Sequence, residues 1–135
     1  MNKTNGIYID GENISPKLFN LIKSTIKIFG KINYIKIYVK KNTVEYKNWY
    51  KYSNNNKITK IIKCQNKIQK DYIDSILIQQ IKGDLKKKNI NSFFIISSDK
   101  IFKKTLKTIV ENKKKIFFLL VKINQQLALN VIKIL

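Results

Sequence analysis

Near the start of the chain, a strand pattern is followed directly by a capped helix, and this order limits the folds that the chain can adopt. Residues 6–9, GIYI, are β-branched and aromatic and end at Asp10 and Gly11, which is typical of a buried strand. Ser15 is a favourable N-cap, and Pro16 occupies the first helical position. A β-hairpin at Asp10-Gly11 would need a second strand where this helix begins. We therefore expect a strand-to-helix connection. The residues that recur at helical spacing before Gly30 are Leu18, Leu21, Ile22, Thr25, Ile26 and Phe29.

The same alternation of strand and helix patterns continues through the rest of the chain. Strands separated by helices of ten or more residues favour a largely parallel sheet covered on both faces. We expect one α/β domain spanning residues 1–135, with no linker or internal repeat. The further strands are predicted at 33–39, 57–63, 92–98 and 114–121, the helices at 43–53, 71–88 and 100–112, and a short helix and final strand within 124–135.

The charge of the chain narrows its partners and its chemistry. The formal net charge is +20, and all 28 basic residues are lysine because arginine and histidine are absent. A field of this sign and size attracts polyanions, so RNA or another nucleic acid is the expected partner and an acidic membrane surface comes second. A genome rich in A and T drifts toward lysine as well, and this origin of the charge stays open. Without histidine, Ser-His-Asp, Cys-His and histidine acid/base mechanisms are excluded. For a hydrolase acting on a polyanion, carboxylates that hold a hard cation are the main remaining route.

The expected location is cytoplasmic. Cys64 is the only cysteine, so an intramolecular disulfide and a zinc site rich in thiolates are both excluded. The N-terminal residues contain no signal-peptide pattern, and no apolar run approaches the roughly 20 residues of a membrane-spanning helix. We expect no membrane association.

The eight acidic residues are not evenly placed. Asp10 follows the first strand and Asp99 follows the strongest one, so both are expected at the carboxyl edge of the sheet, where open α/β folds place their sites. Asp71 and Asp74 lie three apart in the first turn of a helix and share a face. Each of these residues could instead be a helix cap. As a set, Asp10, Asp74 and Asp99 point to a cation site or to neutralisation by nearby lysines.

Four segments, taken in order, resemble the NYN domain, a branch of the PIN-like ribonuclease superfamily, and within it the bacterial LabA-like group. IYIDGENISPK is similar to the opening strand of that group and its D-G-[DE]-N-[IA]-S-P-K continuation. GKINYIKIYVKKNTVEYKNW resembles the next strand and its tryptophan-bearing helix. KDYIDSILIQQI is similar to K-N-x-x-D-x-x-L-x-x-D-A, and INSFFIISSDKIF to D-G-F-x-x-V-S-S-D-S-D-F.

The resemblance implies a PIN-like three-layer α/β/α fold with an acidic pocket that binds Mg²⁺ or Mn²⁺ and hydrolyses RNA. By matching position, Asp10, Asp74 and Asp99 would be the catalytic metal ligands. The supporting polar groups would be Asn13 and either Ser97 or Ser98. The RNA-binding lysines beside the pocket would be Lys40, Lys41, Lys100, Lys103 and Lys104.

Three positions depart from the family pattern. Gln80 and Ile101 stand where the family has further aspartates, and the Lys40-Lys41 pair replaces an acidic position after the second strand. Losing these acids weakens metal affinity, although Glu12 or Asp71 could partly compensate. The leading hypothesis is a metal-dependent endoribonuclease. The alternative is a catalytically decayed NYN domain that binds RNA or acts as a subunit with a protein partner or a second copy of itself.

Aromatic residues in the helix predicted at 43–53 allow two interpretations. Tyr46, Trp49, Tyr50 and Tyr52 could stack on RNA bases. Their helical spacing also fits a helix face packed on the core, and we favour this second interpretation for Trp49.

Overall fold

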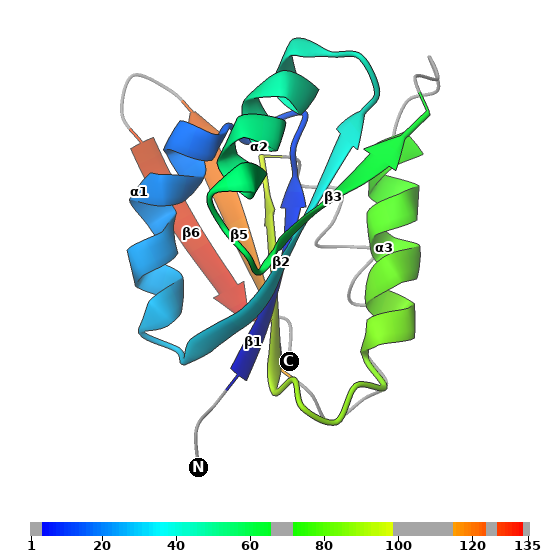
Figure 1. The fold of residues 1–135 in the computed structure, drawn as a ribbon. Coiled ribbons are helices and arrows are strands. Elements are labelled where there is room, and N and C mark those ends of the chain that lie inside the picture. Colours follow the sequence, from blue (N-terminus) through cyan, green and yellow to red (C-terminus); the bar gives the residue numbers. More distant parts are fainter. Residues whose placement is uncertain (1–3, 66–71, 99–114, 124–126, 134–135) are drawn as a thin grey trace.

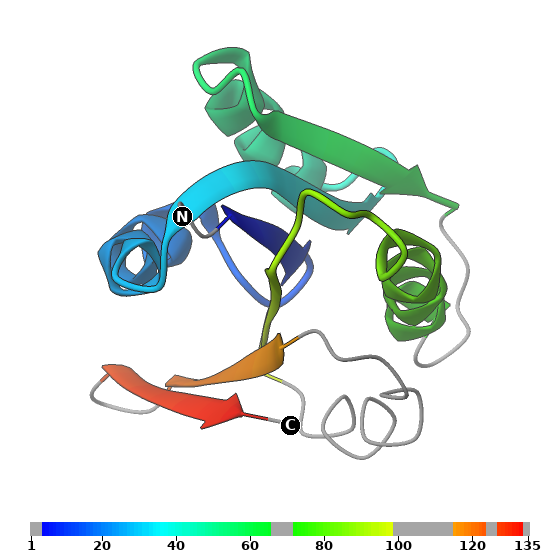
Figure 2. The same ribbon diagram turned by 90° about the horizontal axis from the view of Figure 1, so that it is seen from below.

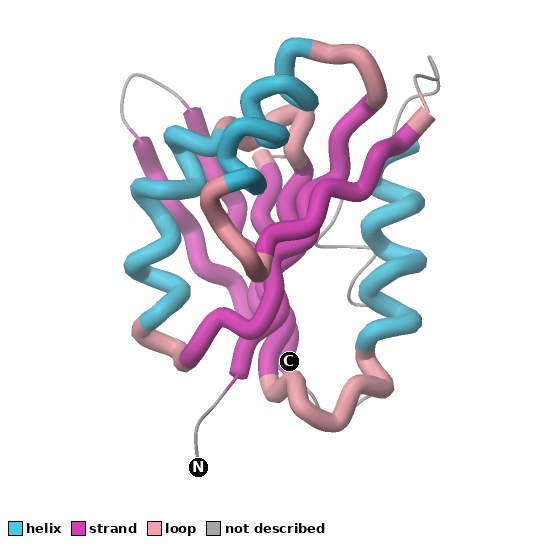
Figure 3. Tube along the Cα trace, in the orientation of Figure 1, coloured by secondary structure: helices cyan, strands magenta, loops and turns pink. Residues whose placement is uncertain are grey.

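Strands and helices alternate through residues 4–97, as the sequence predicted. The computed structural model describes residues 4–65, 72–98, 115–123 and 127–133. In these ranges the six strands form one sheet in the order β3-β2-β1-β4-β5-β6, with every neighbouring pair parallel except β5 and β6 (Figures 1 and 3). The predicted α/β class with a mainly parallel sheet is confirmed. The elements are β1 (Thr4–Asp10), α1 (Pro16–Lys27), β2 (Lys31–Lys40), α2 (Val44–Asn54), β3 (Thr59–Cys64), α3 (Tyr72–Asp84), β4 (Ser92–Ser97), β5 (Lys115–Ile123) and β6 (Leu127–Lys133).

Strand β1 lies between β2 and β4 and is buried on both faces. Every residue from Asn5 to Asp10 is buried. Successive side chains of a strand point to opposite faces, so Ile7 and Ile9 enter one core while Tyr8 enters the other. Burial on both faces is the usual condition of a strand in a parallel sheet, and it explains the continuous apolar run IYI.

Helices cover both faces of the sheet. Residues of α1 and α2, among them Phe19, Ile22 and Trp49, pack with Ile7 and Ile9. On the opposite face, α3 packs through Ile73, Leu77 and Ile81 with Tyr8 and Tyr38. Figure 2 shows α1 and α3 on opposite sides of β1 and β2. The three layers of the predicted α/β/α arrangement are therefore present.

Helix α1 begins as the sequence predicted but presents a different face to the core. The Ser15 hydroxyl accepts a hydrogen bond from the Leu18 amide at 3.1 Å, and Pro16 is the first helical residue. Leu21, one of the residues that recur at helical spacing, is 61% exposed. Phe19, which is not in that set, is fully buried. Helical spacing therefore located the helix without fixing which of its residues face the core.

The C-terminal part of the chain adds two strands. The strand predicted at 114–121 is confirmed as β5, and the final strand predicted within 124–135 is confirmed as β6. Residues 127–133 are strand throughout, so they do not contain the short helix that was expected before the final strand. The helix predicted at 100–112 lies outside the described residues. In the described part of the chain, no helix has the length and apolar character needed to cross a membrane.

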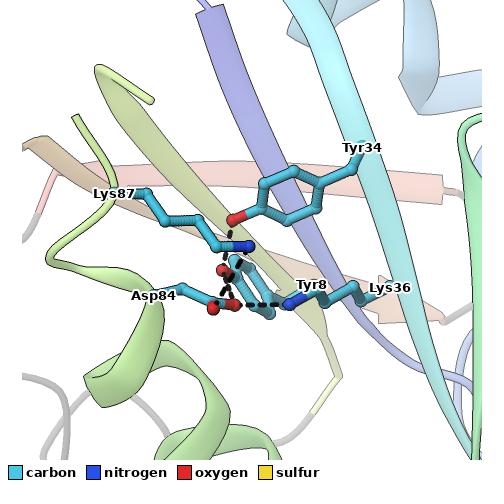
Figure 4. Close-up of polar contacts among 5 residues, drawn as sticks. All are labelled: Tyr8, Tyr34, Lys36, Asp84 and Lys87. Atoms are coloured by element: carbon cyan, nitrogen blue, oxygen red, sulfur yellow. Dashed lines mark hydrogen bonds and ion pairs between the residues drawn. The ribbon is translucent and has the colours of Figure 1, made fainter. Parts of the chain in front are cut away.

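A cluster of polar side chains fixes the end of α3 to the sheet (Figure 4). The Asp84 Oδ2 atom lies 2.6 Å from Lys36 Nζ and accepts a hydrogen bond from the Tyr8 hydroxyl at 2.7 Å, while Lys87 Nζ lies 3.4 Å from Asp84 Oδ1. Because the Tyr8 proton points to Asp84, the Tyr8 oxygen accepts from the Tyr34 hydroxyl. Cation–π contacts of Lys36 and Lys87 with the Tyr34 ring, at 5.0 and 4.8 Å from its centroid, close the cluster. We call these five residues the Asp84 cluster.

The cluster settles the charge states of its members. Burial alone would raise the pKa of Asp84, but the hydrogen bonds from Lys36 and Tyr8 and the charges of Lys36 and Lys87 outweigh it, so the pKa lies below its ordinary value. Burial raises the pKa of Tyr34 to about 12 and raises the pKa of Tyr8 further still. At neutral pH both tyrosines therefore stay protonated donors beside an ionised carboxylate. Gly6 leaves the space for the Tyr34 hydroxyl, because a Cβ at that position would overlap it.

We expect Asp84→Asn to lower the free energy of unfolding at pH 7 by about 3 kcal/mol, since it leaves the largely buried Lys36 ammonium without its counter-charge. The pKa of Asp84 is lower in the folded state, so its contribution is complete above the unfolded carboxyl pKa of about 3.9 and disappears as the pH falls through the folded value. Urea unfolding of both proteins between pH 7 and pH 2.5 should show the two stabilities converging in acid. Glu45→Gln, at an exposed acid in the first turn of α2, is the control. Equal stability of Asp84→Asn and wild type at pH 7 would contradict a stabilising role.

Candidate functional site

Asp10 is a buried carboxylate at the carboxyl end of the central strand. Its side chain is 1% exposed. The Asn13 side-chain amide donates a hydrogen bond to Asp10 Oδ2 at 2.7 Å, and the Ser97 hydroxyl donates to the same oxygen at 3.0 Å. Asn13 belongs to the turn after β1, and Ser97 ends the neighbouring strand β4. Three predicted site residues, from two distant segments of the chain, are thus brought together at one oxygen atom.

The turn after Asp10 is tight and leaves no room for a side chain at Gly11. The amides of Asn13 and Ile14 both donate to the Asp10 carbonyl oxygen, at 3.2 and 3.0 Å. The Gly11 amide donates to the carbonyl oxygen of Tyr38 in β2 at 2.9 Å. A Cβ built at Gly11 would lie 2.9 Å from that same oxygen and would overlap apolar side chains of β2. A glycine is therefore needed here because of close packing.

Trp49 anchors this turn from α2. Its side chain is fully buried, and its indole N–H donates to the carbonyl oxygens of Gly11 at 3.2 Å and Ile14 at 3.0 Å. The interpretation of Trp49 as a core residue is confirmed. Its ring packs beside Phe19 of α1 and Tyr52 of α2. The residue joins the apolar core to the backbone of the turn that carries Asn13.

Asp74 is at the same edge of the sheet, on α3. It lies in the first turn of that helix and is 9% exposed. Because α3 connects two parallel strands, its first turn lies at the edge where β1 and β4 end (Figure 1). Asp10 is two residues after Tyr8, which packs in the α3-side core, so the alternation of a strand directs Asp10 to the α3 face as well. Asp10 and Asp74 therefore share an edge and a face.

The oxygen atoms of these side chains are of the kind that bind a hard cation. Carboxylate, amide and hydroxyl oxygens are the ligands that Mg²⁺ and Mn²⁺ accept in proteins. Within residues 4–65 and 72–98, no group of three acidic, histidine or cysteine residues is assembled. Asp10 and Asp74 would supply two carboxylates, and a third carboxylate for the set would have to come from outside these ranges.

Several predicted site residues lie outside the described residues. They are Asp71, Asp99, Lys100, Lys103 and Lys104, together with Ile101, one of the departures from the family pattern. Their roles stay predictions. Ser97 and Ser98, predicted as alternatives, differ in the structure: Ser97 is buried and bonded to Asp10, while Ser98 is exposed.

Glu12 lies in the turn, and the lysine pair at the end of β2 lies beside it. The Lys40 amide donates to Glu12 Oε1 at 3.1 Å, and the Lys41 amide donates to the Cys64 carbonyl oxygen at 2.9 Å. Burial raises the pKa of Glu12, and the charges of Glu45 and Asp10 add to this, against the opposing effect of the Lys40 hydrogen bond. Glu12 thus joins the turn to the end of β2. The Lys41 side chain is exposed and that of Lys40 is half-buried.

Gln80 does not lie beside Asp74. It is exposed and six residues further along α3, which places it about 9 Å along the helix axis. An acid at this position would lie well apart from the Asp74 carboxylate. The difference from the family pattern at Gln80 therefore leaves the pairing of Asp10 with Asp74 at the sheet edge unchanged.

The family model of the NYN domain matches residues 5–132, nearly the whole chain. The chain belongs to the NYN domain family. NYN domains are a branch of the PIN-like nucleases, which accounts for the parallel sheet with its acidic edge. No curated protein and no solved structure matches this NYN domain.

Sequence reasoning missed the Asp84 cluster of this NYN domain. It counted Asp84 among the acids but assigned it no role, and it did not select Tyr8, Tyr34 or Lys36. The one available signal was the alternation of β1 and β2, which places Tyr8, Tyr34 and Lys36 on one face of the sheet. Nothing in the spacing indicated that the last residue of α3 would meet them.

We expect opposite effects from two glycine substitutions in the NYN domain. Gly11→Ala should lower the free energy of unfolding by about 1–3 kcal/mol, because the added methyl group overlaps β2. Gly83→Ala, in α3, should raise it by about 0.5–1 kcal/mol, because nothing lies within 4 Å of the added Cβ and alanine favours a helix. Urea unfolding of the two variants measures both. A Gly11→Ala protein as stable as wild type would show that the turn can move away from β2.

Proposed function

We propose that this NYN domain is a Mg²⁺- or Mn²⁺-dependent endoribonuclease. The observation that carries the proposal is the buried Asp10 carboxylate, held by Asn13 and Ser97 at the edge of the sheet where α3 presents Asp74. Aligning a carboxylate by two hydrogen bonds is what a metal ligand requires, because supporting hydrogen bonds orient ligands and tune them. Membership in the NYN family supports hydrolysis of RNA as the reaction.

The acidic residues would hold the metal ion. Asp10 and Asp74 supply oxygen ligands from β1 and α3, and Asp99, just beyond β4, is proposed as the third. When bound, the ion would polarise the scissile phosphate, lower the pKa of a water molecule and neutralise charge on the leaving oxygen. With three carboxylates in the set, one ion is the expected occupancy.

Side chains around Asp10 have distinct tasks. Ser97 is buried and holds Asp10 Oδ2 from the β4 side, so it positions the carboxylate away from solvent. Asn13 holds the same oxygen from the exposed side of the turn. The backbone of that turn is fixed by the Trp49 indole, so the orientation of Asp10 does not depend on side-chain contacts alone.

Lysines at this edge would bind the RNA backbone. Lys40 ends β2 and Lys41 follows it, next to the turn that carries Asn13. Lys100, Lys103 and Lys104 are proposed to extend this surface after β4. Tyr50 is the one residue of the aromatic set that is more than half exposed, at 51%, and is therefore the available stacking surface on α2.

Asp10→Asn should lower Mn²⁺-dependent cleavage of single-stranded RNA at least about 100-fold, since it removes a ligand charge while keeping the shape of the side chain. Ser97→Ala should lower it about 10- to 100-fold through loss of a supporting hydrogen bond. The rates are measured with purified protein in Mn²⁺, in Mg²⁺ and in EDTA.

The matched control for this test is Glu45→Gln, which removes one exposed acid from α2 and keeps Asp10 with its hydrogen bonds from Asn13 and Ser97. Its cleavage rate should equal that of wild type. Identical metal-dependent cleavage by Asp10→Asn and wild type would contradict the proposed role of Asp10. If wild type cleaves RNA neither in Mn²⁺ nor in Mg²⁺, the proposal that the protein is an endoribonuclease is contradicted.

A second candidate function is RNA binding by a domain that has lost catalysis. The observation that favours it is the Lys40-Lys41 pair at the edge, where the family pattern has an acid. Such a domain would bind RNA in EDTA, and its affinity would survive replacement of both Asp10 and Asp74 by asparagine. An endoribonuclease would instead lose metal-dependent cleavage in those variants.

Both functions predict phosphate contacts from Lys40 and Lys41. Replacing both with glutamine should reduce the slope of log Kobs against log salt by about 1.4, at about 0.7 per contact with single-stranded RNA. Lys86→Gln with Lys88→Gln, at two exposed lysines after α3, is the control of equal charge. RNA affinity is measured by fluorescence anisotropy from 50 to 300 mM salt. Equal slopes in the two double variants would place the RNA elsewhere.

A further inference from the structure

A second basic site lies at the opposite end of the sheet. An open cleft with a volume of about 520 Å³ lies where α1 ends and β2 begins. Figure 3 shows the connecting loop between these elements. The cleft is large enough for a ligand of nucleotide size, since pockets for small molecules span roughly 300–1,000 Å³. Its lining residues are Lys23, Lys27, Gly30, Lys31, Ile32 and Ile58.

The charge of this cleft is concentrated and, within the described residues, not neutralised. Lys23, Lys27 and Lys31 make up half of its lining, compared with 28 lysines among 135 residues in the chain. None of the three forms an ion pair with a described acid, because the pairs found there join Lys36 and Lys87 to Asp84. The lining of the cleft is therefore richer in lysine than the chain as a whole.

Neighbouring features do not cancel this positive charge. The C-terminal end of α1 contributes a partial charge of about −0.5, which is small beside three ammonium groups. The pKa of Lys23 is lowered by burial and by the charge of Lys27. Like charges held close together with partial burial are unfavourable on their own, and a bound anion would relieve this repulsion.

The remaining lining is apolar. Ile58 is 42% exposed at its side of the cleft, while Ile32 is buried in the core behind it. A phosphate ester has a charged group for the lysines and an apolar or aromatic part for such a surface. A free inorganic anion would use only the lysines.

The cleft is separate from the candidate active site. Lys31 opens β2, whereas Asp10 pairs with Tyr38, seven residues further along the same strand. At about 3.3 Å per residue the two sites lie about 23 Å apart along the strand. Ile32 also packs in the α1-side core, while Asp10 points to the α3 face. One ligand group cannot occupy both sites.

We propose that this cleft is a phosphate-binding site for RNA, distinct from the acidic edge, which holds the chain at a second point. The proposal shares RNA as ligand with the proposed function but does not require cleavage. The site recognises phosphate esters through Lys23, Lys27 and Lys31 and contacts the nucleoside part through Ile58.

The test compares two triple variants of equal net charge. One replaces Lys23, Lys27 and Lys31 with glutamine. The control replaces three exposed lysines of α2 and β3 with glutamine and so removes the same charge. These lysines are Lys47, Lys51 and Lys60. Both are measured in EDTA, where cleavage does not contribute. We expect the cleft variant to lose at least tenfold in affinity for single-stranded RNA and about 2 units of salt slope, with a smaller effect in the control.

Amide NMR titrations locate the ligand and identify its source. The probes are inorganic phosphate, adenosine monophosphate and a single-stranded RNA oligonucleotide. We expect saturable shifts at Gly30, Lys31 and Ile32 with RNA, abolished in the cleft variant. Saturation by adenosine monophosphate at lower concentration than RNA would overturn RNA as the ligand and assign a free nucleotide.

Equal RNA affinities of the two triple variants, or RNA shifts that avoid residues 30–32, would overturn the site. Failure of this proposal is distinguishable from failure of the proposed function. The proposed function is tested by RNA cleavage with the Asp10→Asn variant in the presence of metal. The cleft is tested by RNA binding in EDTA, without metal. If the protein binds RNA through the cleft and cleaves no RNA, the cleft proposal stands and the endoribonuclease proposal fails.

Discussion

Burial of β1 on both faces is the constraint from which the other features follow. Its residues alternate between two cores, so α1 and α2 must cover one face and α3 the other. Because β1 is central, its last residue lies at the middle of the carboxyl edge rather than at a margin. A carboxylate there is surrounded by the ends of β2 and β4 and by the first turn of α3. The position of Asp10 is therefore a consequence of how the apolar residues before it are packed.

Two of the aspartates on the α3 face of the sheet, Asp84 and Asp10, have different environments. Asp84, at the end of α3, has two lysines and a tyrosine hydroxyl as partners, and its charge is used within the fold. Among its contacts with described residues, Asp10 accepts hydrogen bonds from the Asn13 amide and the Ser97 hydroxyl, and these two bonds orient the carboxylate. Asp84 therefore serves the packing of α3 on the sheet, while Asp10 is an oriented carboxylate at the candidate site.

Local sequence signals predicted the order of elements because each had a local physical cause. Ser15 and Pro16 form the cap at α1, and the Asp10-Gly11 turn leads into that helix as expected. Exposure of Leu21 and burial of Phe19 were not predictable from spacing, since both fit a helix, and Phe19 packs against the Trp49 and Tyr52 rings of α2. The link between Ser97 and Asp10 followed from the family resemblance and strand order. The Asp84 cluster joins residues 76 positions apart, and no local pattern encodes such a contact.

The chain has a single tryptophan, and its position gives the molecule a built-in optical reporter. The indole of Trp49 is shielded from water, so its emission belongs to a folded, apolar environment. Its N–H is bonded to the backbone of the turn that carries Asn13, so a change in that turn alters the surroundings of the fluorophore directly. Intrinsic fluorescence of this protein therefore follows the state of one loop at the sheet edge as well as global unfolding, without any added label.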